Sequence, residues 1–354
     1  MSKVAAVVAA GHLPGSRGPD TYAVDCPFWW INDHTGLIVR PSHRVTWPDD
    51  GYIVDTRSLR YTHAGMTSLF RYTIPGFATK TLSGKPTGQI VYNIGGFQAS
   101  PDAIWGIVCG FDFRSADPRP KWTVGAFELA HPGSIHWAEA HVGETFQWLT
   151  GSRSWLGLYS DYRGLVHLRT YTNGLSRITV TETLLPPSIG GEYLPGLEGA
   201  SSGGSATAVG EEPNSNPLRL RIYGIRLAAP DHQPSVEQTD VPAPLVGADE
   251  RVLEHRLSPD GTKMAWLISY THYPFNLRKL AGLAARIGIV PYRVQSICVS
   301  NVDGSAAHPI GEIRAQLGRV VDDLDWLPGG KSISFLYMHA IYTIPIGGSA
   351  GSDD

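Results

Sequence analysis

Short runs of apolar residues alternate with clusters of Gly, Pro, Asp and Ser along most of the chain. Within many runs, hydrophobic and polar residues alternate one by one, which is typical of β-strands with one buried face. Five of these runs follow a turn of the Pro-Asp-Gly type or a close variant, which reverses the chain between two strands. The five turns predict β-hairpins, at 47–51, 97–102, 148–152, 257–261 and 326–330.

The predicted hairpins recur about every 50 residues, apart from two longer gaps. The gap between the third and fourth copies is about two steps long, so we expect a degenerate sixth copy near residue 205. The gap before the last copy contains a segment that breaks the strand pattern. Its Leu277, Leu280, Leu283 and Ile287 recur at three- and four-residue spacing, which predicts a short inserted helix near 276–290.

A second recurring phrase, an alternating strand ending in turn residues, follows several of the hairpins, at 69–76, 166–174, 296–304 and 340–347. Joining each phrase to its hairpin gives a unit of about four strands in about 50 residues. Such a unit cannot bury both of its faces alone. Radial stacking of the units around an axis covers each sheet with its neighbours, so the pattern predicts an all-β chain forming a β-propeller.

Four segments also resemble a known family. The stretches SPDGTKMAWL (258–267), SPDAIWGIV (100–108), VSNVDGS (299–305) and IYTIPIGG (341–348) are similar to the TolB-type, WD40-like propeller repeat, also called the PD40 repeat. The resemblance implies a six-bladed propeller of a kind that binds peptides, proteins or sugars. It does not carry a function with it, because propellers host binding modules and several enzyme chemistries alike.

The domain organisation follows from these patterns. We expect one propeller domain over 1–348, with a flexible Gly/Ser-rich loop at about 190–217 and a disordered tail at 349–354. The segment 28–37 reads as strand–turn–strand and could be an additional hairpin, so five to seven blades fit the sequence.

The composition excludes several classes of protein. The chain has 29 Lys and Arg against 32 Asp and Glu, a net charge of −3, and this balance argues against nucleic-acid binding. An apolar run of about 18 residues, the length of a transmembrane helix, does not occur. The short apolar stretch at 4–9 is at the lower limit for a signal peptide, which slightly favours a cytoplasmic protein over an exported one. Three cysteines are too few for a disulfide framework.

One local cluster holds most of the candidate ligands, with His131, His136 and His141 near Glu139 and Glu144. Imidazole nitrogens and carboxylate oxygens bind divalent cations, so the three histidines are the candidate metal ligands. Their five-residue steps fit neither one helix face nor one strand face, and we therefore predict no cofactor. A polar ligand site without metal and an ordinary solvated loop are the alternatives.

Two further histidines, His272 and His339, stand beside aromatic residues and are either ligand-binding or packing positions. Asp49, Asp260 and Asp325 belong to or adjoin the repeated turns, where aspartate accepts hydrogen bonds from backbone amides, and we interpret them as structural.

The predicted function is a non-catalytic binding or scaffolding propeller that recognises a protein, peptide or saccharide at a mouth of its axial channel. The alternative is a propeller enzyme, a lyase or hydrolase, acting on a carbohydrate or another small polar substrate. The sequence assigns no catalytic residue and no oligomeric state.

Overall fold

The computed structural model describes residues 5–9, 28–40, 50–58, 60–63, 71–72, 79–80, 86–87, 90–91, 94–112, 121–149, 153–187, 189, 196–199, 204–212, 218–227, 234–244, 249–273, 291–315, 320–337 and 340–347. Every regular element in these ranges is a β-strand. The prediction of an all-β chain is therefore confirmed for this part of the protein. Within the same ranges, no helix is long and apolar enough to cross a membrane.

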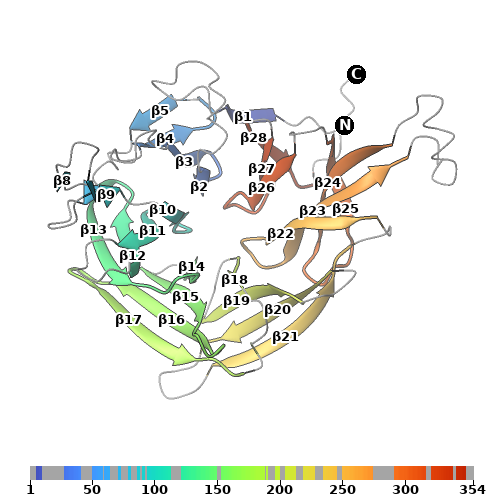
Figure 1. The fold of residues 1–354 in the computed structure, drawn as a ribbon. Coiled ribbons are helices and arrows are strands. Elements are labelled where there is room, and N and C mark those ends of the chain that lie inside the picture. The colour runs from blue at the N-terminus through green and yellow to red at the C-terminus, as the bar shows by residue number, and fades with distance from the viewer. Residues whose placement is uncertain are drawn as a thin grey trace.

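The strands pair into six four-stranded antiparallel sheets that surround a common axis, which is the arrangement of a β-propeller (Figure 1). Three sheets consist of β2 (Phe28–Asn32), β3 (Thr35–Arg40), β4 (Asp50–Asp55) and β5 (Arg60–His63); of β10 (Ile94–Ala99), β11 (Trp105–Asp112), β12 (Lys121–Glu128) and β13 (His131–Glu139); and of β14 (Thr145–Trp148), β15 (Ser154–Ser160), β16 (Val166–Asn173) and β17 (Ile178–Leu184). Two more consist of β18 (Gly196–Leu197), β19 (Ser205–Glu211), β20 (Arg219–Arg226) and β21 (Ser235–Pro242), and of β22 (Arg251–Leu257), β23 (Lys263–His272), β24 (Tyr292–Asn301) and β25 (His308–Arg314). Two short ladders, β6 (Arg71–Tyr72) with β9 (Ile90–Val91) and β7 (Thr79–Lys80) with β8 (Pro86–Thr87), lie between the first two of these sheets in sequence.

The remaining sheet joins the two ends of the chain. It contains β26 (Val321–Trp326), β27 (Ser332–Tyr337) and β28 (Ala340–Pro345), and its outer strand is β1 (Ala5–Ala9). The strands β1 and β28 are antiparallel, with Ala5 opposite Thr343 and Ala9 opposite Ala340. The structure thus has five blades of four consecutive strands and not the predicted six, and the remaining sheet is a composite of the two ends of the chain. The last repeat supplies three strands, so its fourth must come from elsewhere in the chain.

The antiparallel order places the loops of the propeller on two faces. In each blade of consecutive strands, the first strand lies nearest the axis and the fourth lies outermost (Figure 1). Turns between first and second strands lie on one face, here called the turn face. Turns between second and third strands, and the connections from one blade to the next, lie on the other, here called the connector face.

The turn face carries the repeated Pro-Asp-Gly turns. In the turn that follows β22, Ser258 Oγ donates to Asp260 Oδ1 at 2.6 Å, and Lys263 N donates to Ser258 Oγ at 2.9 Å. After β10, Ser100 and Asp102 repeat the first of these bonds at 2.5 Å. These bonds confirm the predicted hairpins at 97–102 and 257–261. The strand boundaries confirm those at 148–152 and 326–330 as well.

The first blade corrects the predicted register of the repeat. Its first hairpin turns at Asn32–Thr35, where Asn32 Oδ1 accepts a hydrogen bond from His34 N at 2.9 Å. The segment 28–37 is therefore the leading hairpin of this blade and not an additional one. In the phrase predicted as a hairpin at 47–51, Asp50 and Gly51 begin β4, and the rest lies outside the described residues.

The segment predicted as a flexible loop at 190–217 instead contains β18 and β19, and their hairpin is the expected copy near residue 205. Ala206 and Ala208 of β19 are buried and pack in one cluster with Tyr223 and Leu156. The prediction of a loop was wrong because small side chains, which look weakly apolar in the sequence, permit close packing between blades.

The predicted helix at 276–290 and the predicted tail at 349–354 lie outside the described residues. The strands that flank the first of these segments, β23 and β24, pair up to His272 and Tyr292. His272 and Tyr292, the described residues on either side of this segment, therefore lie at the connector face.

Tryptophans link neighbouring blades. Trp326 Nε1 donates to the carbonyl oxygen of Arg256 at 3.0 Å, and Trp148 Nε1 donates to that of Gln98 at 3.2 Å. In both cases a first strand is bonded to the first strand of the preceding blade. These two tryptophans therefore contribute to packing between blades, since their indole rings are buried and their N–H groups find acceptors there.

Candidate functional site: the axial cavity

The inner strands enclose a cavity of about 490 Å³ on the propeller axis. Its lining comes from the first strands β2, β10, β14, β22 and β26, from the turn after β18, and from parts of β11 and β12. This volume lies within the usual range of ligand-binding sites, about 300–1,000 Å³. The cavity is therefore the leading candidate for a functional site among the described residues.

Aromatic side chains contribute to the cavity wall from several directions. The aromatic side chains come from four blades and include Trp29, Phe97, Phe146, Trp148 and Trp326. Trp29 and Phe97 meet edge to face, with ring centroids 6.1 Å apart. Phe146 meets Tyr171 in the same manner at 6.0 Å. These contacts fix the orientation of the rings that face the cavity.

Asp325 brings a carboxyl group to this wall from β26. The cavity gives the side chain access to solvent, but protein atoms surround it. Burial raises the pKa of Asp325 to about 6, Arg256 opposes this rise, and the acidic side chains of Glu254 and Asp323 add to it. Asp325 Oδ1 accepts a hydrogen bond from Trp326 N at 2.8 Å. Asp325 thus accepts a backbone amide hydrogen bond, as its structural interpretation predicts, and it lines the cavity as well.

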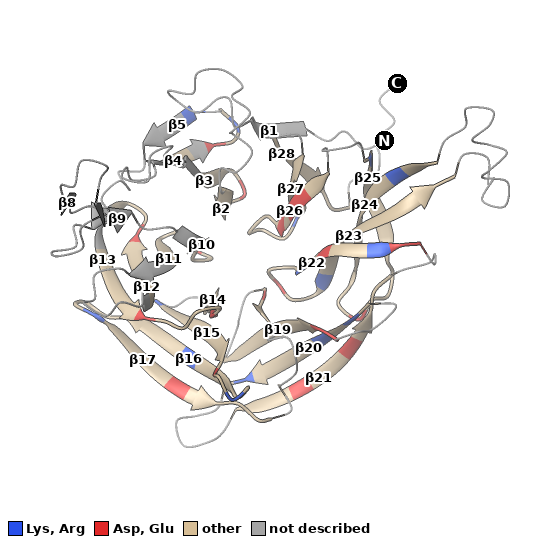
Figure 2. Ribbon diagram, in the orientation of Figure 1, with Lys and Arg blue, Asp and Glu red and all other residues tan. Residues whose placement is uncertain are grey.

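Two more carboxyl groups lie close to Asp325. Glu198 Oε2 accepts a hydrogen bond from Leu257 N at 2.8 Å, and burial raises the pKa of Glu198 to about 7. Glu254 Oε1 forms an ion pair with Arg256 at 2.7 Å, and burial raises the pKa of Glu254 as well. Glu198, Glu254, Asp323 and Asp325 are named here the channel carboxyls. Figure 2 shows acidic positions on the strands around the axis.

A fifth carboxyl group, that of Glu144, also lines the cavity. Glu144 lies in the connection between β13 and β14, directly before β14. Glu144 Oε1 accepts a hydrogen bond from Tyr171 Oη at 2.8 Å, and Glu144 Oε2 accepts one from His141 N at 2.8 Å. Burial raises the pKa of Glu144, although these two bonds and Arg169 oppose the rise. Gly157 is required beside it, because a Cβ there would overlap Glu144 Oε1.

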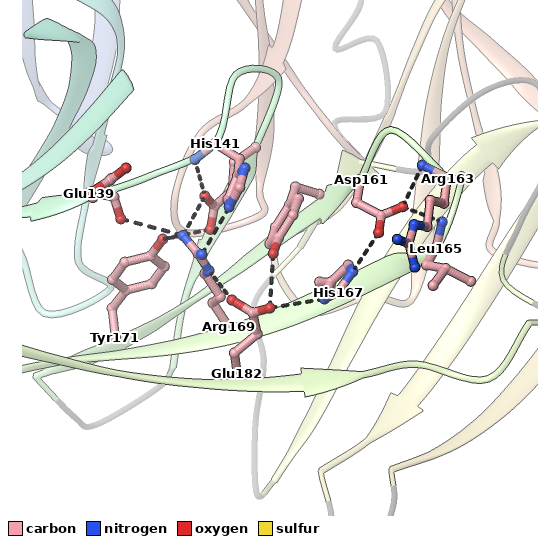
Figure 3. Close-up of polar contacts among 11 residues, drawn as sticks. Glu139, His141, Asp161, Arg163, Leu165, His167, Arg169, Tyr171 and Glu182 are labelled. Carbon is pink, nitrogen blue, oxygen red and sulfur yellow. Dashed lines mark hydrogen bonds and ion pairs between the residues drawn. The ribbon is translucent and has the colours of Figure 1, made fainter. Parts of the chain in front are cut away.

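Glu144 also contacts a polar network around Arg169, in which His141, His167, Tyr171 and Glu182 take part (Figure 3). Arg169 is its centre, with a nitrogen 3.9 Å from Glu144 Oε2. Its Nε donates to Glu182 Oε2 at 2.7 Å, and its second terminal nitrogen donates to His141 Nε2 at 2.9 Å. The network holds the connector between β13 and β14 against the strands of the next blade.

Stacked rings complete the network. The ring of Tyr159 stacks on His141 at 3.8 Å and on His167 at 4.8 Å between centroids. Tyr159 Oη and His167 Nδ1 both donate to Glu182 Oε1, at 2.9 Å each. Burial lowers the pKa of His141, and the positive charge of Arg169 lowers it further. His141 is thus held in its neutral form as an acceptor.

The structure brings together some of the predicted ligand-binding residues. His141 and Glu144 belong to the network, and Glu139 contributes its carbonyl oxygen to Arg169 at 3.4 Å. His136 lies apart, with its Nδ1 2.8 Å from Asn173 Oδ1. Of the predicted residues in this cluster, Glu144 lines the cavity.

Of the other two predicted histidines, the structure describes His272, which is not among the residues that line the cavity. His272 ends β23, with its ring 4.9 Å from that of Tyr292 near the connector face. His339 lies outside the described residues.

The three candidate metal ligands do not converge. His131 is exposed and contacts Glu128 at 3.1 Å, while His136 and His141 bond Asn173 and Arg169. Over the ranges that the structure describes, no group of three or more His, Cys, Asp or Glu side chains could hold a metal ion. The histidines follow one another along β13 and its connector, so the strand itself separates them.

The sequence interpretation missed the channel carboxyls. A weak signal was present, since Asp322, Asp323 and Asp325 stand together on a first strand, whereas β10 and β14 carry no acidic residue. Their proximity to Glu198 and Glu254 depends on the ring and has no signature in the local sequence.

No family model matches the sequence. No curated protein matches it either. Among solved structures, the chain is similar to an acylaminoacyl peptidase of Pyrococcus horikoshii, with 10% identity, a TM-score of 0.44 and coverage of 86% of this chain and 40% of that one. It is also similar to the β-propeller domain of the Trilobed protease from Pyrococcus furiosus, with 10% identity, a TM-score of 0.43 and coverage of 89% and 76%. For the C-terminal WD40 domain of Sif2 the identity is 10%, the TM-score 0.45 and the coverage 98% and 99%.

The chain therefore spans about 40% of the length of the peptidase that it matches. These similarities concern the fold and say nothing of activity. The resemblance of the turns to the TolB-type repeat stays a prediction.

Proposed function

We propose that this chain, as one propeller domain over 1–348 with TolB-type repeats, is a non-catalytic binding module that takes a segment of a protein or peptide into its axial cavity. The observation that carries the proposal is the wall of this cavity, in which aromatic rings from four blades surround a few polar groups. Fixed aromatic rings supply large contact areas at low entropic cost, which is the usual basis of tight recognition.

The chemistry of the wall favours binding over catalysis. Burial raises the pKa of Cys109 to about 12, so its thiol stays protonated and is a poor nucleophile. Ser100 does donate to an aspartate, but the Ser258–Asp260 pair has the same geometry on another blade. A pair that recurs in equivalent turns supports a structural role, because a catalytic pair would be needed at one place only.

A propeller enzyme acting on a saccharide is the second candidate function. The observation in its favour is the pair Asp325 and Glu198, whose raised pKa values suit a general acid near neutral pH. Incubation of the purified protein with a panel of oligosaccharides, followed by analysis of the products, tests this candidate. Cleavage by the unmodified protein that is lost in Asp325→Asn would favour the enzyme over the binding module as the function of this chain.

Selection of random linear peptides on the immobilised protein tests the binding module. We expect enriched peptides to bind the unmodified protein and to lose affinity for Phe146→Ala, which removes one ring of the wall. The control is Tyr162→Ala, which removes a ring that is 89% exposed on the connector face.

A thermal melt shows whether Phe146→Ala is folded. Phe146→Leu, which keeps an apolar side chain but removes the ring, provides the same test if the alanine variant is destabilised. If the selected peptides bind both Phe146 variants as tightly as the unmodified protein, the peptide does not bind in the cavity. Failure to enrich any peptide would count against the module itself.

A further inference from the structure

The charge of the cavity wall is of one sign. Among the described residues that line it, Glu144 and Asp325 carry charge, and Lys, Arg and His do not occur. Glu198 and Glu254 interact electrostatically with Asp325, and Arg256 is the basic group that acts on all three. Arg256 forms its ion pair with Glu254 at 2.7 Å. The negative potential of the cavity is therefore only partly neutralised by the protein.

Mutual repulsion and burial act on these carboxyls together. Each of Asp325, Glu198 and Glu254 has its pKa raised by burial first, and then by other carboxyls of the group. Their ionised forms would be stabilised by any positive charge that entered the cavity. An anion in the cavity would instead be repelled by the ionised carboxyls.

The wall also holds an acceptor without a donor. Gln98 lines the cavity, and its buried Oε1 has no hydrogen-bond partner within the described part of the chain. An unpaired buried acceptor costs free energy, and a rotation of the side chain that brought Oε1 to the cavity surface would let an N–H group of a ligand recover it. The evidence for a cationic ligand lies in the carboxyl groups and the aromatic rings.

The aromatic rings narrow the chemistry further. Ammonium and guanidinium groups are attracted to the faces of Trp and Phe, and such contacts strengthen when water is excluded. A hydrated metal ion gains little from such a wall, and the described residues contain no set of three side chains that could hold one. The combination of aromatic rings and carboxyl groups therefore suits an organic cation.

We infer that the axial cavity is selective for a cationic group, an ammonium or guanidinium, held between its aromatic wall and the carboxylate of Asp325. This inference rests on the proposed function and names the part of the ligand that the cavity recognises. The cation could belong to a Lys or Arg side chain of a bound peptide or to a small free amine.

Titration calorimetry with three probes tests the inference. The probes are N-acetyl-arginine methylamide, its neutral isostere N-acetyl-citrulline methylamide, and free 1,4-diaminobutane. We expect the arginine probe to bind at least about tenfold more tightly than the citrulline probe, since a hydrogen bond to a charged group is worth this much. Asp325→Asn should reduce the affinity for the arginine probe about tenfold.

The matched control is Asp240→Asn, which makes the same change of charge on the outer strand β21. It should leave the affinity unchanged. Affinity in the unmodified protein should also fall between pH 8 and pH 5, as Asp325 gains a proton. Asp323 on its own strand, Glu254 and Arg256 on β22, and Glu198 after β18 surround Asp325, and Asp325→Asn should reduce this pH dependence.

Equal affinity for the arginine and citrulline probes would overturn the inference, as would unchanged binding in Asp325→Asn. If peptides selected for the cavity bind while none of the cationic probes does, the inference fails and the proposed function stands. If the diamine binds at Asp325 while no peptide does, the cation site stands and the peptide-binding function fails.

Discussion

Trp326 and Arg256 join the first strands of two neighbouring blades through one hydrogen bond, from the indole Nε1 to the backbone carbonyl oxygen at 3.0 Å. Two of the channel carboxyls adjoin this residue pair. Asp325 directly precedes Trp326 and accepts a hydrogen bond from its backbone N, and Glu254 forms an ion pair with the Arg256 side chain. One contact thus fixes both the spacing of the blades and the place of the acidic groups at the axis.

Replacement of this donor should weaken the ring. In Trp326→Phe the buried carbonyl oxygen of Arg256 would lose its hydrogen-bond donor. We therefore expect the free energy of unfolding to fall by about 1–3 kcal/mol. Trp148→Phe should lose a similar amount, since it breaks the equivalent bond to Gln98. Denaturant titration measures both, and unchanged stability in the two variants would show that these bonds do not hold the blades together.

Glycine in two strands offers a sharper test of packing. Gly157→Ala would place a Cβ against Glu144 Oε1 and the ring of Tyr171, so overpacking should cost about 1–3 kcal/mol. Gly224→Ala is the control, because its nearest neighbour, Glu237 O, would be 3.9 Å away. We expect Gly224→Ala to be neutral or slightly stabilising. Equal effects of the two substitutions in thermal melts would contradict the tight fit around Glu144.

The channel carboxyls should make stability depend on pH. Burial raises the pKa of Glu198 to about 7, above its ordinary value near 4.5, so the folded state binds more protons than the unfolded state between about pH 4.5 and pH 7. Stability from this group is therefore lost as the pH rises through that window and is restored on acidification. Asp325 acts with the same sign up to about pH 6.

Other carboxyls act in the opposite direction at lower pH. Hydrogen bonds from Ser258 and Thr262 lower the pKa of Asp260 despite its partial burial, so its contribution is lost on acidification towards pH 3. The difference in melting temperature between the unmodified protein and Glu198→Gln isolates the channel contribution. This difference should grow from pH 5 to pH 8 in favour of the variant. A constant difference would refute the assigned pKa.

Closure of the ring by β1 can be tested with an engineered disulfide. Ala9 and Ala340 are register partners in antiparallel strands, so cysteines placed at both positions should form a disulfide that ties the two ends together. A cross-link across so long a stretch of chain should stabilise the fold by about 2–4 kcal/mol. The control pair, Ala9→Cys with Ile341→Cys, is out of register and should cross-link poorly. Equal cross-linking of the two pairs, judged by mass spectrometry, would mean that β1 does not pair in this register.

Local turn chemistry explains what could be predicted of the fold. The turns that contain Ser100 and Ser258 are stabilised by bonds among residues only two to five positions apart, so the sequence predicts them directly. The spacing of the repeats predicted a hairpin near β19, but the local sequence read as a loop, because the apolar side chains that cover Ala206 and Ala208 belong to other strands.

In the candidate site, too, contacts between residues close in sequence were predictable, and contacts between distant segments were not. Glu139, His141 and Glu144 are close in sequence, and their grouping was predicted. Their partners Arg169 and Glu182 come from strands of the next blade and could not be predicted. His136 separated from the group because it is fixed within β13, where it faces Asn173 instead.

The sequence by itself determined the strands, the turns between them and their repetition, since alternation of side chains and turn preferences act over a few residues. Only the tertiary structure decided that an N-terminal strand completes the last blade and that Glu198 and Glu254 act electrostatically on Asp325 in the cavity wall. The reason is physical: burial and electrostatic potential are sums over all atoms nearby, and around a propeller axis those atoms come from every blade. The acidic, aromatic cavity is thus a property of the closed ring and of no single repeat.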